Sequence, residues 1–147
     1  MKILIVDDHP ANLKVARLAL QGEGYEVRTS GDAEDALIVI MSWHPDLILM
    51  DIQLPGMDGY ELTRKLKSDP TTRHIVIIAV TAYAMKGDRQ RAVDSGCDGY
   101  LSKPVDPISL PATISSFLGH PEEKLASLTQ EGPSTLEVYD IPTLSDT

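Results

Sequence analysis

The chain has 147 residues, a length that suits one domain, and 42 % of them are hydrophobic. Its formal net charge of −9 argues against non-specific binding to nucleic acid and against docking on an anionic membrane. Cys97 is the one cysteine, so an internal disulfide is impossible and a reducing compartment is favoured. The sequence runs from Met1 straight into a strand pattern, without a signal peptide or a bilayer-spanning apolar stretch, which predicts a cytoplasmic protein.

Short apolar runs alternate with longer amphipathic stretches, which is the βαβ pattern of a parallel sheet covered by helices on both faces. We expect strands at Lys2–Val6, Tyr25–Thr29, Asp46–Met50, Ile75–Val80 and Gly99–Leu101. We expect helices at Pro10–Gln21, at Ala33–Ser42, from Asp58 onward with Glu61 in capping-box spacing, at Ala84–Asp94, and between Pro107 and Leu118. Because proline lacks a backbone donor, the last helix should begin near Ser109 with Pro111 in its first turn.

The periodicity fades after Gly119. Residues 120–147 contain three prolines, many serines and threonines, and six acidic residues against Lys124. This composition predicts an acidic, flexible tail, within which residues 122–130 could form a short helix. We therefore expect a single domain at 1–119 followed by a tail at 120–147.

Reactive side chains stand at the ends of four predicted strands. Asp7 and Asp8 follow the first strand, Asp51 the third, Thr81 the fourth and Lys103 the fifth. In an open α/β sheet, ligands bind outside the carboxyl ends of the strands. We therefore expect three carboxylates, a hydroxyl and an ammonium to share one cleft, where they can hold a divalent cation and a phosphoryl group.

Each of these residues also has a simpler interpretation. Asp7 and Asp8 could be solvated turn carboxylates near a helix start, Asp51 an ordinary strand-end aspartate, Thr81 a helix N-cap, and Lys103 a surface lysine. As a set they favour phosphoryl chemistry. Magnesium is typically held by one or two carboxylates together with phosphate oxygens, a carboxylate such as Asp51 can act as a nucleophile, and an ammonium suits a phosphate oxygen.

Three further features stay open at the level of sequence. A cis bond between Lys103 and Pro104 would aim the lysine into the cleft, whereas a trans bond would simply end the strand. Cys97 is interpreted as a small buried hydrophobe and Trp43 as packing at the end of the second helix. Four histidines show no ligand spacing and are interpreted as surface residues: His9, His44, His74 and His120.

Over about residues 1–119 the sequence resembles the receiver domain of two-component response regulators. The resemblance rests on four anchors in order: Ile5–Asp8, Asp46–Gly59, Val80–Ala82 and Tyr100–Pro104. Residues 81–88 are especially similar to single-domain regulators of bacterial cell-cycle control and to receivers of hybrid histidine kinases. Residues 67–74 resemble receivers joined to diguanylate cyclases.

The resemblance implies a flavodoxin-like, doubly wound sheet of five parallel strands in the order 2-1-3-4-5, with five helices. It implies that Asp51 accepts a phosphoryl group, that Thr81 and Lys103 contact the phosphoryl oxygens, and that Tyr100 changes rotamer as Thr81 moves. It also implies a Mg²⁺ site, with Mn²⁺ as a substitute. Its ligands would be Asp8, Asp51 and the backbone carbonyl of Gln53, with Asp7 acting through water or as a second ligand.

The implied role is a regulatory switch that catalyses its own phosphotransfer and slow hydrolysis and is not otherwise an enzyme. The implied partners are a sensor histidine kinase or histidine phosphotransferase docking along helix 1 and the loop after strand 5, and a separate output protein on the helix 4–strand 5–helix 5 face. A phosphorylation-dependent homodimer is a further implied partner, whereas direct contact with nucleic acid or membrane is not expected.

Two other classes remain open. A phosphohydrolase that forms an aspartyl phosphate would usually carry Asp-x-Asp after its first strand, whereas here Asp7 and Asp8 are adjacent and Gln53 stands two residues after Asp51. A degenerate receiver would be a binding module that works without phosphate, but the five key residues are all present.

Overall fold

The computed structural model describes residues 1–82, 86–118 and 139–140. The strands β1 (Lys2–Val6), β2 (Glu26–Ser30), β3 (Leu47–Asp51), β4 (Val76–Thr81) and β5 (Gly99–Ser102) form a parallel sheet in the order β2-β1-β3-β4-β5. The helices are α1 (Pro10–Gln21), α2 (Ala33–Trp43), α3 (Gly59–Ser68), α4 (Lys86–Ser95) and α5 (Leu110–Leu118). The predicted flavodoxin-like fold, with its strand order and five helices, is confirmed.

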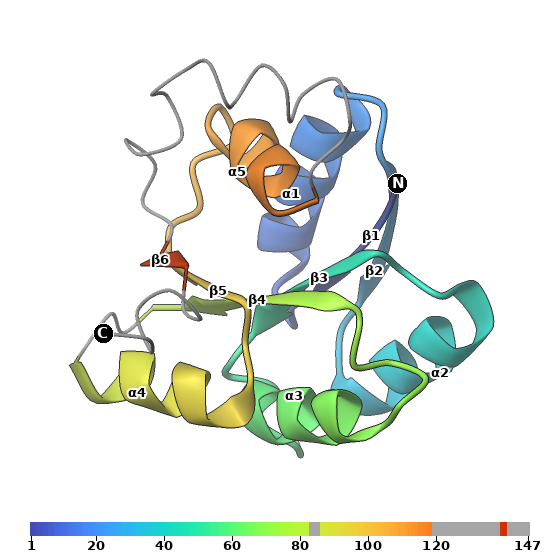
Figure 1. The fold of residues 1–147 in the computed structure, drawn as a ribbon. Helices are drawn as coiled ribbons and strands as arrows, with labels where there is room; N and C mark the ends of the chain where they lie inside the picture. The colour runs from blue at the N-terminus through green and yellow to red at the C-terminus, as the bar shows by residue number, and fades with distance from the viewer. Residues whose placement is uncertain (83–85, 119–138, 141–147) are drawn as a thin grey trace.

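The helices cover both faces of this sheet (Figure 1): α1 and α5 lie on one face, and α2, α3 and α4 on the other. Alternate side chains of β3 pack against the helices on opposite faces of the sheet, because successive side chains of a strand point to opposite faces. Leu47 and Leu49 pack in the cluster beneath α1 and α5, whereas Ile48 and Met50 pack in the cluster beneath the other three helices. The unbroken apolar character of the central strands follows from this burial on both sides.

A sixth strand, β6 (Tyr139–Asp140), pairs antiparallel with β5 at the edge of the sheet. At these two residues the structure differs from the flexible tail that we expected, because the outer edge of β5 offers backbone groups for pairing. The rest of the tail, including the helix expected at 122–130, lies outside the described residues.

Several element boundaries differ from the prediction by a residue or two. Asp51 and Thr81 are the last residues of β3 and β4, because strand pairing continues through them: Asp51 lies opposite Val80, and Thr81 opposite Ser102. Thr81 is therefore not the N-cap of α4, which begins at Lys86. The start of α5 is Leu110, one residue later than expected.

The helix ends follow local chemistry. The side chains of Asp32 and Asp58 accept the backbone N–H groups of Asp35 and Glu61 at 2.8 Å, which caps α2 and α3. Pro111 is the second residue of α5, where a backbone N–H has no partner within the helix to lose. Among the described residues, none of the helices has the length and apolar content needed to cross a bilayer.

Candidate phosphoryl-acceptor site

Asp51 is buried at the carboxyl end of β3, with 2 % of its surface exposed. One carboxylate oxygen, Oδ1, accepts the backbone N–H of Gln53 at 3.0 Å. The chain leaving Asp51 is held tightly, since the N–H of Ile52 donates to Val80 and the N–H of Gly59 donates to the Ile52 carbonyl at 2.9 Å. The Asp51 side chain therefore has a constrained position at the edge of the sheet.

Gly59 shows how closely the start of α3 approaches this segment. A Cβ atom at Gly59 would lie 2.5 Å from the carbonyl oxygen of Asp51 and 2.9 Å from the Cα of Ile52. Real side chains do not reach such distances, so that only glycine permits this packing. The close approach brings the N-terminus of α3 against the strand end that carries Asp51.

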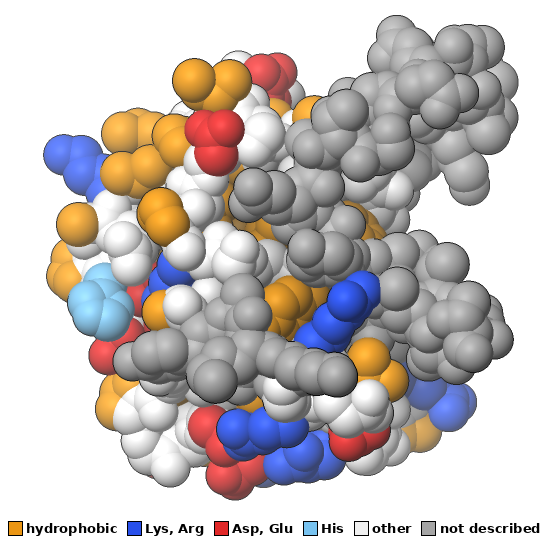
Figure 2. Space-filling view, turned by 90° about the vertical axis from the view of Figure 1, so that its left-hand side faces the viewer, with side chains coloured by type: hydrophobic (Ala, Val, Ile, Leu, Met, Phe, Trp, Pro, Cys, Tyr) orange, Lys and Arg blue, Asp and Glu red, His pale blue; other side chains and the backbone are white. Residues whose placement is uncertain are grey.

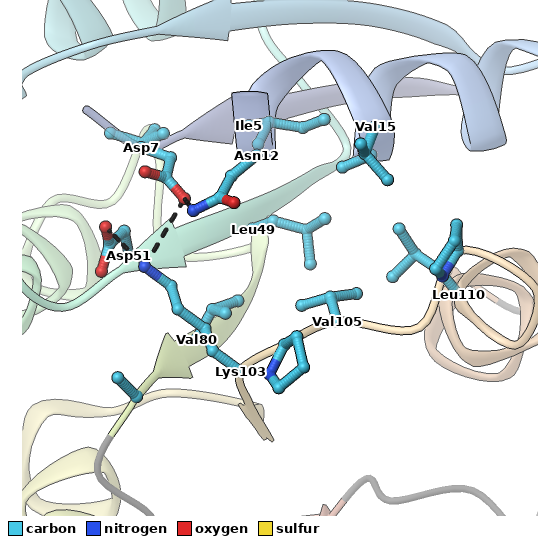
Figure 3. Close-up of a pocket in the computed structure, with 15 residues that line it drawn as sticks. Ile5, Asp7, Asn12, Val15, Leu49, Asp51, Val80, Lys103, Val105 and Leu110 are labelled. Atoms are coloured by element: carbon cyan, nitrogen blue, oxygen red, sulfur yellow. Dashed lines mark hydrogen bonds and ion pairs between the residues drawn. The ribbon is translucent and has the colours of Figure 1, made fainter. Parts of the chain in front are cut away.

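Lys103 comes from the segment after β5 and reaches across the strand ends. Its ammonium Nζ lies 3.0 Å from Oδ2 of Asp51 and 3.6 Å from Oδ2 of Asp7. The backbone N–H of Lys103 donates to the Thr81 carbonyl at 2.7 Å, and the Lys103–Pro104 peptide bond is cis. Figure 3 shows the lysine pointing toward the two carboxylates.

An acidic cluster completes the polar part of the site. One ligand atom from each of Asp7, Asp8, His9 and Asp51 lies within 4.8 Å of the others. Asp7 is buried, and its Oδ1 accepts the backbone N–H of His9 at 2.8 Å. Asp8 is exposed, and its Oδ1 lies 3.0 Å from the His9 ring nitrogen Nδ1.

His9 is a residue whose place the sequence reasoning missed. The prediction of an exposed residue is confirmed, since 66 % of its side chain is accessible, but its ring lies in the acidic cluster. Its position directly after Asp8 was the available signal. Asn12 was also missed: its amide approaches Oδ2 of Asp7 at 3.5 Å from the first turn of α1.

The electrostatics of the cluster favour a cation. Burial raises the pKa of the Asp51 carboxyl, and the Gln53 N–H and the Lys103 ammonium act in the opposite direction. Three carboxylates face one ammonium, so that the site carries more negative than positive charge. Converging carboxylate oxygens are the donors that a hard divalent ion such as Mg²⁺ prefers, and the residues present therefore fit such an ion.

Thr81 and Tyr100 are both buried, on the neighbouring strands β4 and β5. Thr81 ends β4, and Tyr100 lies in β5 opposite Ala79. Gln53 is exposed after the end of β3, with its N–H directed to Asp51. The structure thus brings Asp7, Asp8, Asp51, Thr81 and Lys103 to one edge of the sheet, while the phosphoryl contact, the rotamer change and the carbonyl ligand remain predictions.

A cavity of about 530 Å³ extends away from the acidic cluster between α1 and the segment that leads into α5. Asp7, Asp51 and Lys103 lie at one end of it, and Val15, Val105 and Leu110 form apolar walls (Figure 3). The sequence reasoning did not find this cavity, because its walls come from segments that are far apart in the chain.

The surface beside this cavity is apolar as well. Val15 and Leu18 of α1 are 49 % and 55 % exposed, and Ile108, just before α5, is 89 % exposed. Figure 2 shows hydrophobic side chains on the upper left of one face, where they are mixed with acidic, basic and other side chains.

The remaining predictions concern residues away from the site. Cys97 is buried in the core, where burial raises the pKa of its thiol, and Trp43 is buried as the last residue of α2. His44 and His74 are exposed, as expected, whereas His120 lies outside the described residues.

The sequence matches a family model for the response regulator receiver domain over residues 3–115. Among curated proteins, the polar-differentiation response regulator DivK of Brucella ovis is 46 % identical over 117 residues, which cover 80 % of this chain and 95 % of that protein. DivK of Brucella anthropi is 45 % identical with the same coverage. These relatives are regulators close to the length of the domain described above.

Solved structures agree with the sequence matches. A response regulator from Chloroflexus aurantiacus superimposes with a TM-score of 0.76 at 34 % identity, covering 81 % of this chain and 98 % of that chain. The receiver domain of a sensor histidine kinase from Pseudomonas aeruginosa gives a TM-score of 0.74 at 35 % identity, with the same coverage. That structure has a magnesium ion coordinated in its active site cleft.

Proposed function

Because this chain belongs to the family of response regulator receiver domains, we propose that it is a switch in which a histidine kinase or histidine phosphotransferase phosphorylates Asp51. Receiver domains are regulatory domains of two-component signalling. The observation that carries it is the buried Asp51 carboxylate, held between the Gln53 N–H and the Lys103 ammonium within the acidic cluster.

In the proposed reaction, a carboxylate oxygen of Asp51 forms a bond to phosphorus while the bond from phosphorus to a histidine nitrogen breaks. The electron pair of the broken bond stays on the imidazole, which then takes up a proton. Phosphoryl transfer depends mainly on in-line positioning and on neutralising the equatorial oxygens. Lys103 is already 3.0 Å from the Asp51 carboxylate and would follow the charge onto the phosphoryl group, which Thr81 would also contact.

The acidic cluster would hold the cation that this reaction needs. Asp8, Asp51 and the backbone carbonyl of Gln53 are the proposed ligands, with Asp7 acting directly or through water, and Mn²⁺ would substitute for Mg²⁺. When bound, the ion supplies positive charge to the phosphoryl oxygens. Without a cation, the carboxylates would repel the incoming phosphoryl group, because Lys103 supplies one positive charge against three negative ones.

The phosphoryl donor would dock over the cavity between α1 and the β5–α5 segment. Its apolar walls begin beside Asp51, so a helix that carries a phosphohistidine could bury its apolar face there while the histidine reaches the carboxylate. Output would follow from a population shift. Thr81 would follow the new acceptor oxygens, Tyr100 would change rotamer, and the α4–β5–α5 face would change its affinity for a separate output protein or a second copy.

The test is labelling with a small phosphoryl donor. Acetyl phosphate and Mg²⁺ should add one phosphoryl group to the wild-type chain, measured by intact mass, and none to Asp51→Asn. Asp94→Asn, which changes an exposed aspartate on α4, is the matched control and should be labelled as the wild type is. In the wild type alone, the treatment should also shift the amide resonances of α4 and Tyr100. Equal labelling of Asp51→Asn would overturn the assignment.

The same experiment separates the other two functional classes. A phosphohydrolase would release phosphate from the donor continuously, with many turnovers for each protein molecule. A module that binds its partner without phosphate would show neither labelling nor turnover. The proposed receiver modifies itself once and then loses the group slowly.

A further inference from the structure

The outer edge of β5 is a part of the sheet that takes no part in the proposed phosphoryl transfer itself. In the parallel part of the sheet, β5 is an edge strand, with β4 on its inner side. On its outer side, β6 runs antiparallel to it, with Asp140 opposite Gly99 and Tyr139 opposite Tyr100 (Figure 1). A segment from the C-terminal part of the chain therefore occupies the outer edge of β5, the strand that connects α4 to α5.

The backbone of Gly99 is placed to receive this strand. Along a strand, the backbone groups of successive residues point to opposite edges. The N–H of Asp98 donates to Ile77 at the start of β4, so the N–H and carbonyl of the next residue, Gly99, face away from β4. Gly99 and Asp140 are thus the pair that can exchange two backbone hydrogen bonds.

The sequence around β6 independently has the pattern of a strand. Residues 134–141 lie between Pro133 and Pro142, and prolines commonly bound strands. Within them, Val138, Tyr139 and Ile141 belong to the residue types that favour extended structure. This pattern agrees with the extended pairing of residues 139 and 140 with β5.

Chain length permits the pairing within one molecule. Twenty residues, 119–138, separate the end of α5 from the start of β6. At roughly 3.3 Å per residue, such a segment can span about 66 Å, which exceeds the diameter of a domain of this size. No exchange between two molecules is needed to bring the segment to β5.

We propose that the outer edge of β5 is a strand-binding surface and that the chain's own C-terminal segment around Tyr139 and Asp140 is its occupant. The pairing closes an edge that would otherwise offer free backbone groups to other chains. It also means that any protein adding an extended segment at β5 must first displace this strand. The segment then acts as an intramolecular competitor for the α4–β5–α5 face.

The experiment measures amide hydrogen exchange in the full, unphosphorylated chain without Mg²⁺, so that its result does not depend on Asp51. Asp140→Pro removes the backbone donor that pairs with Gly99. We expect the Gly99 amide to exchange about tenfold faster or more, while the Leu49 amide in the central strand β3 is unchanged and reports an intact fold. Asp140→Asn keeps the backbone donor and removes only the charge, and it should leave Gly99 as in the wild type.

A second arm identifies the occupant. A chain ending at Gly132 should show fast exchange at Gly99, and adding a synthetic peptide of residues 134–143 should restore slow exchange where a scrambled peptide does not. Equal exchange at Gly99 in the wild type, Asp140→Pro and the shortened chain would overturn the proposal. Protection that appears only at protein concentrations where the full chain is dimeric would also overturn it, because the occupant would then be a second copy.

Discussion

The Lys103 ammonium forms ion pairs with two carboxylates, those of Asp51 and Asp7. Its ammonium lies 3.0 Å from Asp51 and 3.6 Å from Asp7, and 18 % of its side chain remains exposed. Asp51 itself is almost fully buried, where an unpaired charge is unfavourable. The lysine therefore stabilises the site before phosphorylation and would stabilise the phosphoryl group after it.

We expect Lys103→Met, which keeps the aliphatic stem, to lower the free energy of unfolding by about 1–3 kcal/mol in the absence of divalent ions, because it leaves the buried carboxylates without their cation. Saturating Mg²⁺ should recover much of this loss, since binding to the folded state alone stabilises it. Urea unfolding with and without Mg²⁺ measures both quantities. Lys14→Met, at an exposed position on α1, is the control. A loss of the same size with and without Mg²⁺ would contradict a shared cation site.

At the scale of elements, Lys67 joins the end of α3 to the sheet. Its ammonium donates to the carbonyls of Arg73 and Ile75 at 3.1 and 2.7 Å and lies 2.7 Å from Oδ2 of Asp98. The same oxygen of Asp98 accepts the N–H of Ile77 at 2.9 Å. One ion pair thus connects α3, the entry to β4 and the turn before β5.

Lys67→Met should cost about 1–3 kcal/mol of unfolding free energy, because two carbonyls and a carboxylate lose a charged donor that is 19 % exposed. Lys65→Met, two residues earlier and exposed on the same helix, should change the stability by less than about 0.5 kcal/mol. Chemical denaturation of the two variants side by side is the measurement. Equal effects at the two positions would show that the bridge contributes no more than an ordinary surface lysine.

At the scale of the whole molecule, the two hydrophobic clusters are made of residues from 3 to 118 as far as the structure describes the chain. The acidic cluster and the cavity also lie within this range. We therefore propose that residues 1–119 are the receiver domain and that residues 120–147 are an acidic appendage. The β6 pairing engages two residues of that appendage, which is little area compared with the core.

Truncation after Gly119 should leave folding and Asp51 labelling nearly intact. The melting temperature should fall by less than roughly 5 °C, which corresponds to about 1–2 kcal/mol for a domain of this size. Thermal unfolding followed by circular dichroism, together with intact-mass labelling, measures both properties. A larger loss would make the tail a structural part of the domain, beyond its proposed role as a strand on β5.

The sequence by itself was sufficient for the fold class and for the prediction that Asp7, Asp51 and Lys103 lie together, whereas it missed His9 and Asn12. Strands buried on both faces must be apolar along their whole length, so that polar residues such as Asp51 and Thr81 mark where each run ends. Parallel strands place those ends at the same edge of the sheet, which is why a local pattern predicted that Asp7, Asp51 and Lys103 lie together. The sequence also predicted helix caps such as Asp58, because a capping side chain and the backbone N–H that it accepts are only three positions apart in the chain.

Only the tertiary structure decided the features that depend on distant segments. Asp51 and Thr81 belong to their strands because the neighbouring strands extend far enough to pair with them. The His9 ring joins the acidic cluster through the geometry of one turn. The cavity walls come from α1 and the segment before α5. The strand β6 pairs with β5 although 36 residues separate Ser102 from Tyr139 in the chain. Such pairings depend on the spatial arrangement of the sheet, and no local periodicity in the chain encodes them.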